Sequence, residues 1–127
     1  LGDVYKRQIY LEFAEAFPDL KIILSHWGGG IPFFELNPKL KLLLKNFYYD
    51  TSASPLLYDM TIFRNVIHLV GAEKIIFGSY YPLKLYPKKQ KQVEMQTFIK
   101  DIQSKAGLNQ NEYEQIFEKN ICSLLNL

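Results

Sequence analysis

The sequence has only one cysteine, Cys122, among its 127 residues, so the chain cannot form an internal disulfide. It also lacks a long hydrophobic run: no segment approaches the roughly 20 apolar residues that span a bilayer, and none has the charged-then-apolar layout of a secretory signal. A large charge of one sign is missing too, since the formal net charge is +2 and the lysine cluster "PKKQK" (87–91) is short. We therefore expect a cytoplasmic protein with no membrane or nucleic-acid partner.

Apolar residues, by contrast, are plentiful. Hydrophobic residues make up 48% of the sequence and aromatic residues 15%, which is enough for one ordinary core. No internal repeat or low-complexity segment interrupts the chain. The composition therefore predicts a single globular domain.

The first eight residues, "LGDVYKRQ", differ from the rest because they show neither an apolar period nor a capping signal. Read as codons, residues 3–8 spell GAT GTG TAT AAG AGA CAG, the transposon end sequence used to tag DNA in sequencing libraries. We predict that residues 1–8 derive from such an adapter and that protein sequence begins at Ile9. The alternative is a genuine disordered tail.

Three short apolar runs, at 20–26, 46–54 and 73–79, are typical of strands buried on both faces. Helical patterns lie between and after them, and their ends carry recognisable signals. The first helix should turn Ile9, Phe13 and Phe17 toward the core and stop at Pro18. The other expected signals are Asn37 with Pro38, Asp59 with Gly71, Gly107, and a capping box formed by Asn109 and Glu112.

Strands that alternate with helices at this spacing predict an α/β fold with parallel pairing and right-handed crossovers. Three strands are few for a free-standing sheet, because the apolar edges would be left unpaired. A (β/α)8 barrel needs about 250 residues, so roughly half of one fits this length. The fold expected is a partial (β/α)8 TIM barrel comprising the last three parallel strands and their helices.

Polar side chains follow each predicted strand. His26, Asp50 and Tyr80 occupy these positions, and the carboxyl ends of parallel strands meet at one mouth. A histidine there can shuttle protons or bind a metal, or it can simply make a structural hydrogen bond. Asp50, with Thr51 and Ser52, either binds substrate or caps the following turn.

Several neighbouring residues allow two interpretations. Gly28–Gly30 permit a sharp turn with positive φ or a close approach to a ligand, although they do not match the G-x-G-x-x-G pattern. Trp27, with Phe33 and Phe34, could wall a substrate pocket or pack in the core. His68 falls within a predicted helix, where a surface or packing role is the expectation.

Four segments together resemble a known family: "FPDLKIILSHWGGGIPF" (17–33), "NFYYDTSAS" (46–54), "VGAEKIIFGSYYP" (70–82) and "EKNICSLLNL" (118–127). In order and spacing they are similar to the carboxyl-terminal half of the amidohydrolase-related metal-dependent hydrolases. That group includes the decarboxylases of aminocarboxymuconate semialdehyde and of resorcylate-like acids. The resemblance implies that residues 9–127 are the C-terminal half of a TIM-barrel domain.

The resemblance also implies a divalent metal, commonly Zn²⁺, at the barrel mouth, with His26 acting beside it as acid or base. The family's loop reads Gly-Ser-Asp-Tyr-Pro and its aspartate serves the metal, whereas this sequence has Tyr80 at that position. The other usual ligands would lie upstream of Ile9. Neutral tyrosine is a poor zinc ligand because its pKa is about 10, and its ring is bulky. We therefore expect the intact parent, but not this chain, to bind the metal.

The resulting expectation is a fragment of a metal-dependent hydrolase or decarboxylase that acts on a small molecule and is inactive as given. Its predicted site comprises His26 as the catalytic residue, Tyr80 at the metal position, and Trp27, Asp50 and Ser52 as substrate-binding residues. One alternative is a non-catalytic barrel relative that acts as a small-molecule binding or interaction protein. Another is a self-contained three-stranded module that binds phosphate through its glycines. A homodimer is compatible with the family.

Overall fold

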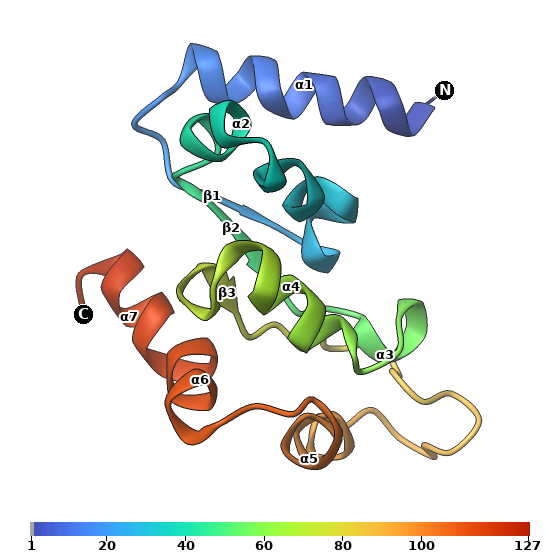
Figure 1. Ribbon diagram of the computed structural model, residues 1–127. Coiled ribbons are helices and arrows are strands. Elements are labelled where there is room, and N and C mark those ends of the chain that lie inside the picture. Colours follow the sequence, from blue (N-terminus) through green and yellow to red (C-terminus); the bar gives the residue numbers. More distant parts are fainter. Residues whose placement is uncertain (1) are drawn as a thin grey trace.

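The computed structural model describes residues 2–127, with side chains from residue 7 onward. Strands alternate with helices along the described chain (Figure 1). The strands are β1 (Ile22–Leu24), β2 (Phe47–Asp50) and β3 (Ile75–Ile76). The α-helices are α1 (Gly2–Ala16), α2 (Pro38–Leu43), α3 (Ser54–Leu57), α4 (Ile62–Val70), α5 (Gln96–Lys105), α6 (Gln110–Glu114) and α7 (Asn120–Leu125). Two 3-10 segments, η1 (His26–Leu36) and η2 (Ala72–Lys74), and a π-helical segment, η3 (Gln115–Lys119), complete the order.

The three strands form one parallel sheet in the order β1-β2-β3, as the βα alternation predicts. Ile22 pairs with Phe47, and Tyr49 pairs with Ile75. The strands are shorter than the apolar runs that predicted them, with three, four and two residues. The hydrogen-bonded pairing ends at the carboxyl ends of β1 and β2, where the chain turns away from the sheet. His26, after β1, and Ala53, after β2, have positive φ angles of 54° and 56° in these turns.

The core lies between this sheet and the helices that pack on it. Segments α2 and α4 both contact η1, while η3 and α7 contact β3 (Figure 1). Aromatic and branched side chains fill the interior at close to complete burial, as expected for the main source of folding free energy. The largest of these fully buried apolar side chains are Trp27, Ile31, Leu44, Phe47, Tyr49, Phe63, Ile75, Phe98, Ile102 and Ile116.

Helix α1 does not face the core as its spacing predicts. Ile9, Phe13 and Phe17 are 57%, 40% and 52% exposed, whereas Ala14 is buried. The helix lies at one end of the molecule beside α2, so only a narrow face meets the rest of the chain (Figure 1). The prediction for the three larger residues is therefore wrong. The adapter origin of residues 1–8 stays a prediction: the backbone of residues 2–8 continues α1, while residue 1 and the side chains of residues 2–6 lie outside the described part.

Most of the expected helix-end signals are confirmed. The Asn37 side chain accepts hydrogen bonds from two backbone amides at the start of α2, and Asn109 and Glu112 form the capping box of α6. Gly71 ends α4 with φ 90°. Asp59 differs slightly, because its carboxylate accepts from the backbone N–H of Thr61 at 2.8 Å and so caps the turn just before α4.

Two further expectations concern the membrane and the thiol. No helix within residues 2–127 is long and apolar enough to cross a bilayer. Cys122, on α7, is a free and half-buried thiol.

Candidate functional site

The carboxyl ends of the three strands bring together four of the predicted site residues. The backbone N–H of His26 donates to Asp50 Oδ1 at 3.0 Å, and the His26 Nδ1 atom lies 3.1 Å from Ser52 Oγ. The Tyr80 ring stands edge-on to the His26 ring, with 4.8 Å between centroids. His26, Asp50, Ser52 and Tyr80 therefore form one cluster, which we call the mouth cluster.

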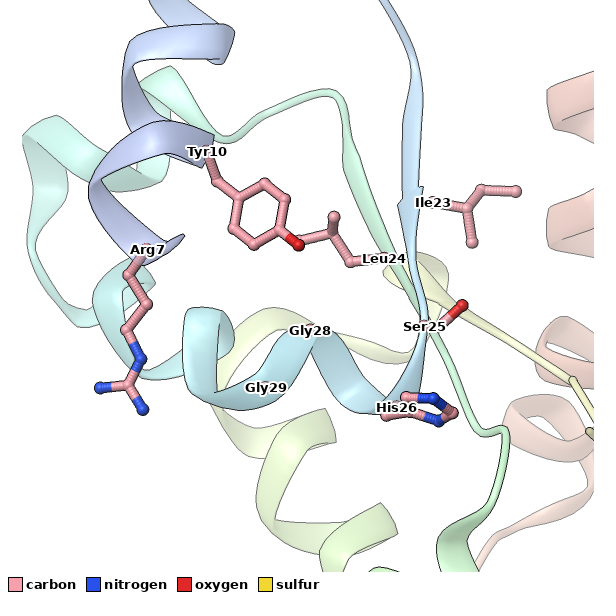
Figure 2. Close-up of a pocket in the computed structure, with 8 residues that line it drawn as sticks. All are labelled: Arg7, Tyr10, Ile23, Leu24, Ser25, His26, Gly28 and Gly29. Carbon is pink, nitrogen blue, oxygen red and sulfur yellow. The ribbon is translucent and has the colours of Figure 1, made fainter. Parts of the chain in front are cut away.

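The turn after β1 positions His26. Five consecutive residues, 26–30, have positive φ angles between 54° and 96°, which makes one left-handed turn. Left-handed backbone costs roughly 1–2 kcal/mol at each residue with a Cβ atom, so three glycines limit that cost to His26 and Trp27. The turn ends the strand abruptly beside the sheet and leaves His26 at its start, next to Ser25 (Figure 2). The prediction that Gly28–Gly30 make a sharp positive-φ turn is confirmed.

Trp27, by contrast, points into the core. It is only 1% exposed, its Nε1–H donates to Ser54 Oγ at 2.8 Å, and its ring packs edge-on against Phe63. Phe33 is 64% exposed and Phe34 packs partly buried against the core, so the three aromatic residues do not form one wall. The substrate-binding role predicted for Trp27 is not supported by its position, because its polar atom is already satisfied and its ring is covered.

Asp50 holds the loop that follows β2. Its Oδ1 atom accepts from the backbone N–H of Ser52 at 2.9 Å and from the Ser52 hydroxyl, in addition to the N–H of His26. A carboxylate that accepts from the backbone two residues ahead is an Asx-turn, which fixes the turn geometry. Of the two interpretations of Asp50, the turn cap matches these bonds directly. Ser52 itself is 3% exposed.

Thr51 is a structural residue whose role the sequence did not reveal. Its hydroxyl accepts from the backbone N–H of Gly78 at 3.0 Å and donates to the Gly78 carbonyl at 3.1 Å. Its own N–H donates to the Ile76 carbonyl at 3.1 Å, and the residue is completely buried. Thr51 thus joins the ends of β2 and β3 beyond the last ladder pair. A hydroxyl residue directly after one strand, matched by a glycine two residues after the next, is the signal that could have indicated it.

We expect Thr51→Val to lower the free energy of unfolding by about 1–3 kcal/mol, because it leaves the half-buried N–H and C=O of Gly78 without their Thr51 partner while keeping the side-chain shape. Chemical denaturation measures this change. The matched control is Thr61→Val, on an exposed residue whose side chain makes no capping bond, for which a change within about 0.5 kcal/mol is expected. Equal losses for the two variants would contradict the role of Thr51.

A cavity of about 530 Å³ opens beside the mouth cluster (Figure 2). Helix α1 lies on one side of it, β1 on another, and the glycine turn lies below. It therefore runs along the edge of β1 that no other described strand covers. Of the mouth cluster only His26 contributes to its walls. The full lining is Arg7, Tyr10, Ile23, Leu24, Ser25, His26, Gly28 and Gly29.

The side chains of the mouth cluster do not provide enough metal ligands to form a metal centre by themselves. Among the residues that the structure describes, no group of three or more His, Cys, Asp and Glu side chains could hold a metal ion. Asp50 Oδ1 already accepts three hydrogen bonds, and the Tyr80 phenol is a weak ligand in its neutral form. The donors within the described part of the chain therefore do not by themselves fit the metal site that the resemblance implies. His68, the other histidine, lies on α4 and is not part of the mouth cluster.

A buried ion pair, Glu35 with Lys74, contacts the side chain of Tyr49 on β2. Glu35, 3% exposed, accepts from the Tyr49 hydroxyl at 2.7 Å and from Lys74 Nζ, which also donates to the Leu44 carbonyl at 2.9 Å. Burial lowers the pKa of Lys74, and burial together with Glu35 raises the pKa of Tyr49. Glu35 Oε2 is buried without a hydrogen-bond partner among the described residues. This group was not anticipated from the sequence.

Solved structures share the fold of this chain. A 2,6-dihydroxybenzoate decarboxylase in complex with 2,6-dihydroxybenzoate matches with TM-score 0.65 and 19% identity, over 88% of this chain and 36% of that one. A dihydroxybenzoic acid decarboxylase from a Polaromonas species, with bound manganese and the inhibitor 2-nitroresorcinol, matches with TM-score 0.65 and 19% identity, over 89% of this chain and 36% of that one. A Staphylococcus aureus protein classed as an amidohydrolase matches with TM-score 0.65 and 26% identity, over 98% of this chain and 41% of that one.

The fold and the position of the site thus define part of a (β/α)8 barrel, with three parallel strands and their helices. The chain spans roughly two fifths of the length of these structures. Residues 8–127 match the amidohydrolase family, and the chain belongs to that family.

Proposed function

We propose that this chain is part of a metal-dependent hydrolase or decarboxylase in which His26 transfers a proton to or from a small-molecule substrate. The observation that carries the proposal is the mouth cluster: His26 is held by Asp50 and Ser52 at the carboxyl ends of parallel strands, in a chain of the amidohydrolase family. Imidazole exchanges protons near neutral pH, which suits a general acid or base. The decarboxylases among the similar structures favour a small aromatic acid as substrate class.

We further propose that the divalent metal belongs to the whole protein and not to this chain alone. Manganese is bound in one similar structure, and Zn²⁺ is the ion that the family resemblance favours. Because the donors present here do not form a centre, no catalytic step is assigned through the metal. We expect negligible metal-dependent turnover of a dihydroxybenzoate by the 127-residue chain. Stoichiometric zinc binding with metal-dependent hydrolysis or decarboxylation would contradict this. A cytoplasmic location and a homodimer stay proposals.

The position of Tyr80 favours a second candidate, a non-catalytic relative that binds a small molecule. Tyr80 is 44% exposed and its ring packs edge-on against His26, where the smaller side chain of an aspartate would leave the imidazole open. Sequencing the source DNA through codon 80 separates the two candidates. An aspartate codon would indicate a damaged copy of a metalloenzyme, whereas a true tyrosine codon would place the binding protein ahead.

We expect Tyr80→Asp to tighten Zn²⁺ or Mn²⁺ binding by on the order of tenfold, about 1.4 kcal/mol, because a carboxylate replaces a neutral phenol beside His26. Equilibrium dialysis of the purified chain measures the affinity. Tyr81→Asp is the control, since it adds the same charge one residue further on, at a side chain that is 64% exposed. If both variants gain equally, the effect is general electrostatics and the position of Tyr80 has no special relation to a metal.

A further inference from the structure

We propose that Asp50 and Ser52 are positioning residues that fix the neutral tautomer of His26, so that Nδ1 carries the proton and Nε2 is free to accept one. This inference deepens the proposed function and rests on it for its catalytic meaning. Both residues were candidates for substrate binding from the sequence, and the structure gives them this different task.

The first step of the argument is what Nδ1 faces. The Ser52 backbone carbonyl oxygen lies 3.2 Å from His26 Nδ1. A carbonyl oxygen has lone pairs but no proton, so a hydrogen bond between these two atoms requires Nδ1 to be the donor. The bond therefore needs a proton on Nδ1.

The second step concerns the Ser52 hydroxyl, which lies 3.1 Å from the same nitrogen. A hydroxyl has one proton to donate, and this one is directed to Asp50 Oδ1, which as a carboxylate oxygen can only accept. The hydroxyl consequently presents a lone pair to the ring. Nδ1 of His26 thus faces two acceptors and no donor among the described residues.

The third step is the backbone. The N–H of His26 donates to Asp50 Oδ1 at 3.0 Å and lies 3.2 Å from Ser52 Oγ, while the N–H of Ser52 donates to the same Asp50 oxygen at 2.9 Å. One carboxylate oxygen therefore holds both the histidine backbone and its ring partner. His26 needs such support because its φ of 54° is unfavourable for a residue with a Cβ atom.

The consequence is a histidine whose two nitrogens have separate tasks. Nδ1 is committed to the protein, and Nε2 keeps the lone pair that a general base requires. Orientation of the base by a third group is a recurring feature of proton-transfer sites.

The experiment is nitrogen-15 NMR of the chain labelled at histidine. Two-bond correlations at about pH 9, well above the ordinary imidazole pKa of about 6.5, report the neutral tautomer of each ring. If the chain self-associates, magic-angle-spinning solid-state NMR of the labelled protein gives the same information. The sequence contains two histidines, so His68 is an internal control in every spectrum. We expect about a tenfold excess of the Nδ1–H form at His26, the ratio that one net hydrogen bond supports. A ratio of the Nδ1–H to the Nε2–H form that is equal for His26 and His68, or an excess of the Nε2–H form at His26, would overturn the proposal.

Three variants assign the effect to its residues. Asp50→Ala should lower the excess more than Ser52→Ala does, because it frees the Ser52 hydroxyl to donate to Nδ1 and also removes the acceptor of the Ser52 N–H. Asp50→Asn, which retains the acceptor oxygen, should keep most of the excess. Ser52→Ala should reduce the excess without abolishing it, because the Ser52 backbone carbonyl remains. An unchanged ratio in Asp50→Ala would remove Asp50 from the proposal. If that variant fails to fold, as loss of amide dispersion would show, the ratios in the other two variants decide.

The readout does not depend on turnover. A missing Nδ1–H excess counts against this inference alone. An intact excess in a full-length protein that transfers no proton counts against the proposed function.

Discussion

Gly28→Ala should lower the free energy of unfolding by about 2–5 kcal/mol, the sum of two separate costs. The residue has φ +68°, where any side chain is unfavourable by roughly 1–2 kcal/mol. A Cβ atom at this position would also lie 2.8 Å and 2.9 Å from two ring carbons of Tyr49, closer than atoms in contact can be. That ring is fully buried, and its hydroxyl bonds to Glu35, so it has little freedom to move. Overpacking of this kind costs about 1–3 kcal/mol.

The adjacent glycine provides the matched control for this prediction. Gly29 has φ +58°, and a Cβ atom there would meet nothing within 4 Å. Gly29→Ala should therefore lower the free energy of unfolding only by the cost of a side chain at positive φ, about 1–2 kcal/mol. Urea unfolding of the two variants, followed by the fluorescence of Trp27, compares them directly. If Gly28→Ala is no more destabilising than Gly29→Ala, contact with Tyr49 is not what requires a glycine at residue 28.

Lys74→Met should have an effect of similar size, about 3–5 kcal/mol of lost unfolding free energy. The Lys74 side chain is 12% exposed and its partner Glu35 is 1% exposed, so removal of the ammonium leaves a carboxylate buried without its counter-charge. Glu35 already has one oxygen that lacks a partner among the described residues, which leaves little to compensate the loss. The carboxylate would have to take up a proton or open the structure to water.

Two further variants make the Lys74 prediction specific. Lys119→Met removes the surface pair with Glu114, whose side chains are 56% and 41% exposed, and should cost under about 1 kcal/mol. Adding Glu35→Leu to Lys74→Met removes the unpaired charge and should recover much of the stability. Thermal and urea unfolding of the single and double variants give the comparison. A loss at Lys74 no larger than at Lys119, or no recovery in the double variant, would contradict the account of a buried pair.

The features that sequence analysis predicted well are those that local signals determine. Alternation of apolar runs with helical periods predicted the parallel sheet, and that sheet placed His26, Asp50 and Tyr80 at one mouth. The caps at Asn37 and Asn109 were predictable because each depends on backbone groups within three residues.

What the sequence did not reveal depends on which partner each side chain meets. The apolar spacing of α1 is the same whether that stripe faces a sheet or solvent, and so the burial of Phe13 was predicted wrongly. Trp27 follows His26 directly, but the left-handed turn directs it into the core. The pair of Glu35 and Lys74 lies 39 residues apart in the sequence, and no local pattern indicates that the two will meet.

The two edges of the sheet differ in a way that affects self-association. On the outer side of β3, the Ile75 carbonyl accepts from the Asn120 side-chain amide at 2.7 Å, and the Phe77 N–H donates to the Ile116 carbonyl at 2.9 Å. No described strand pairs with the outer side of β1. Strand addition between molecules therefore has one available edge per chain. Pairing of two such edges would use up both, so sheet extension by this route stops at two molecules and does not propagate into a fibre.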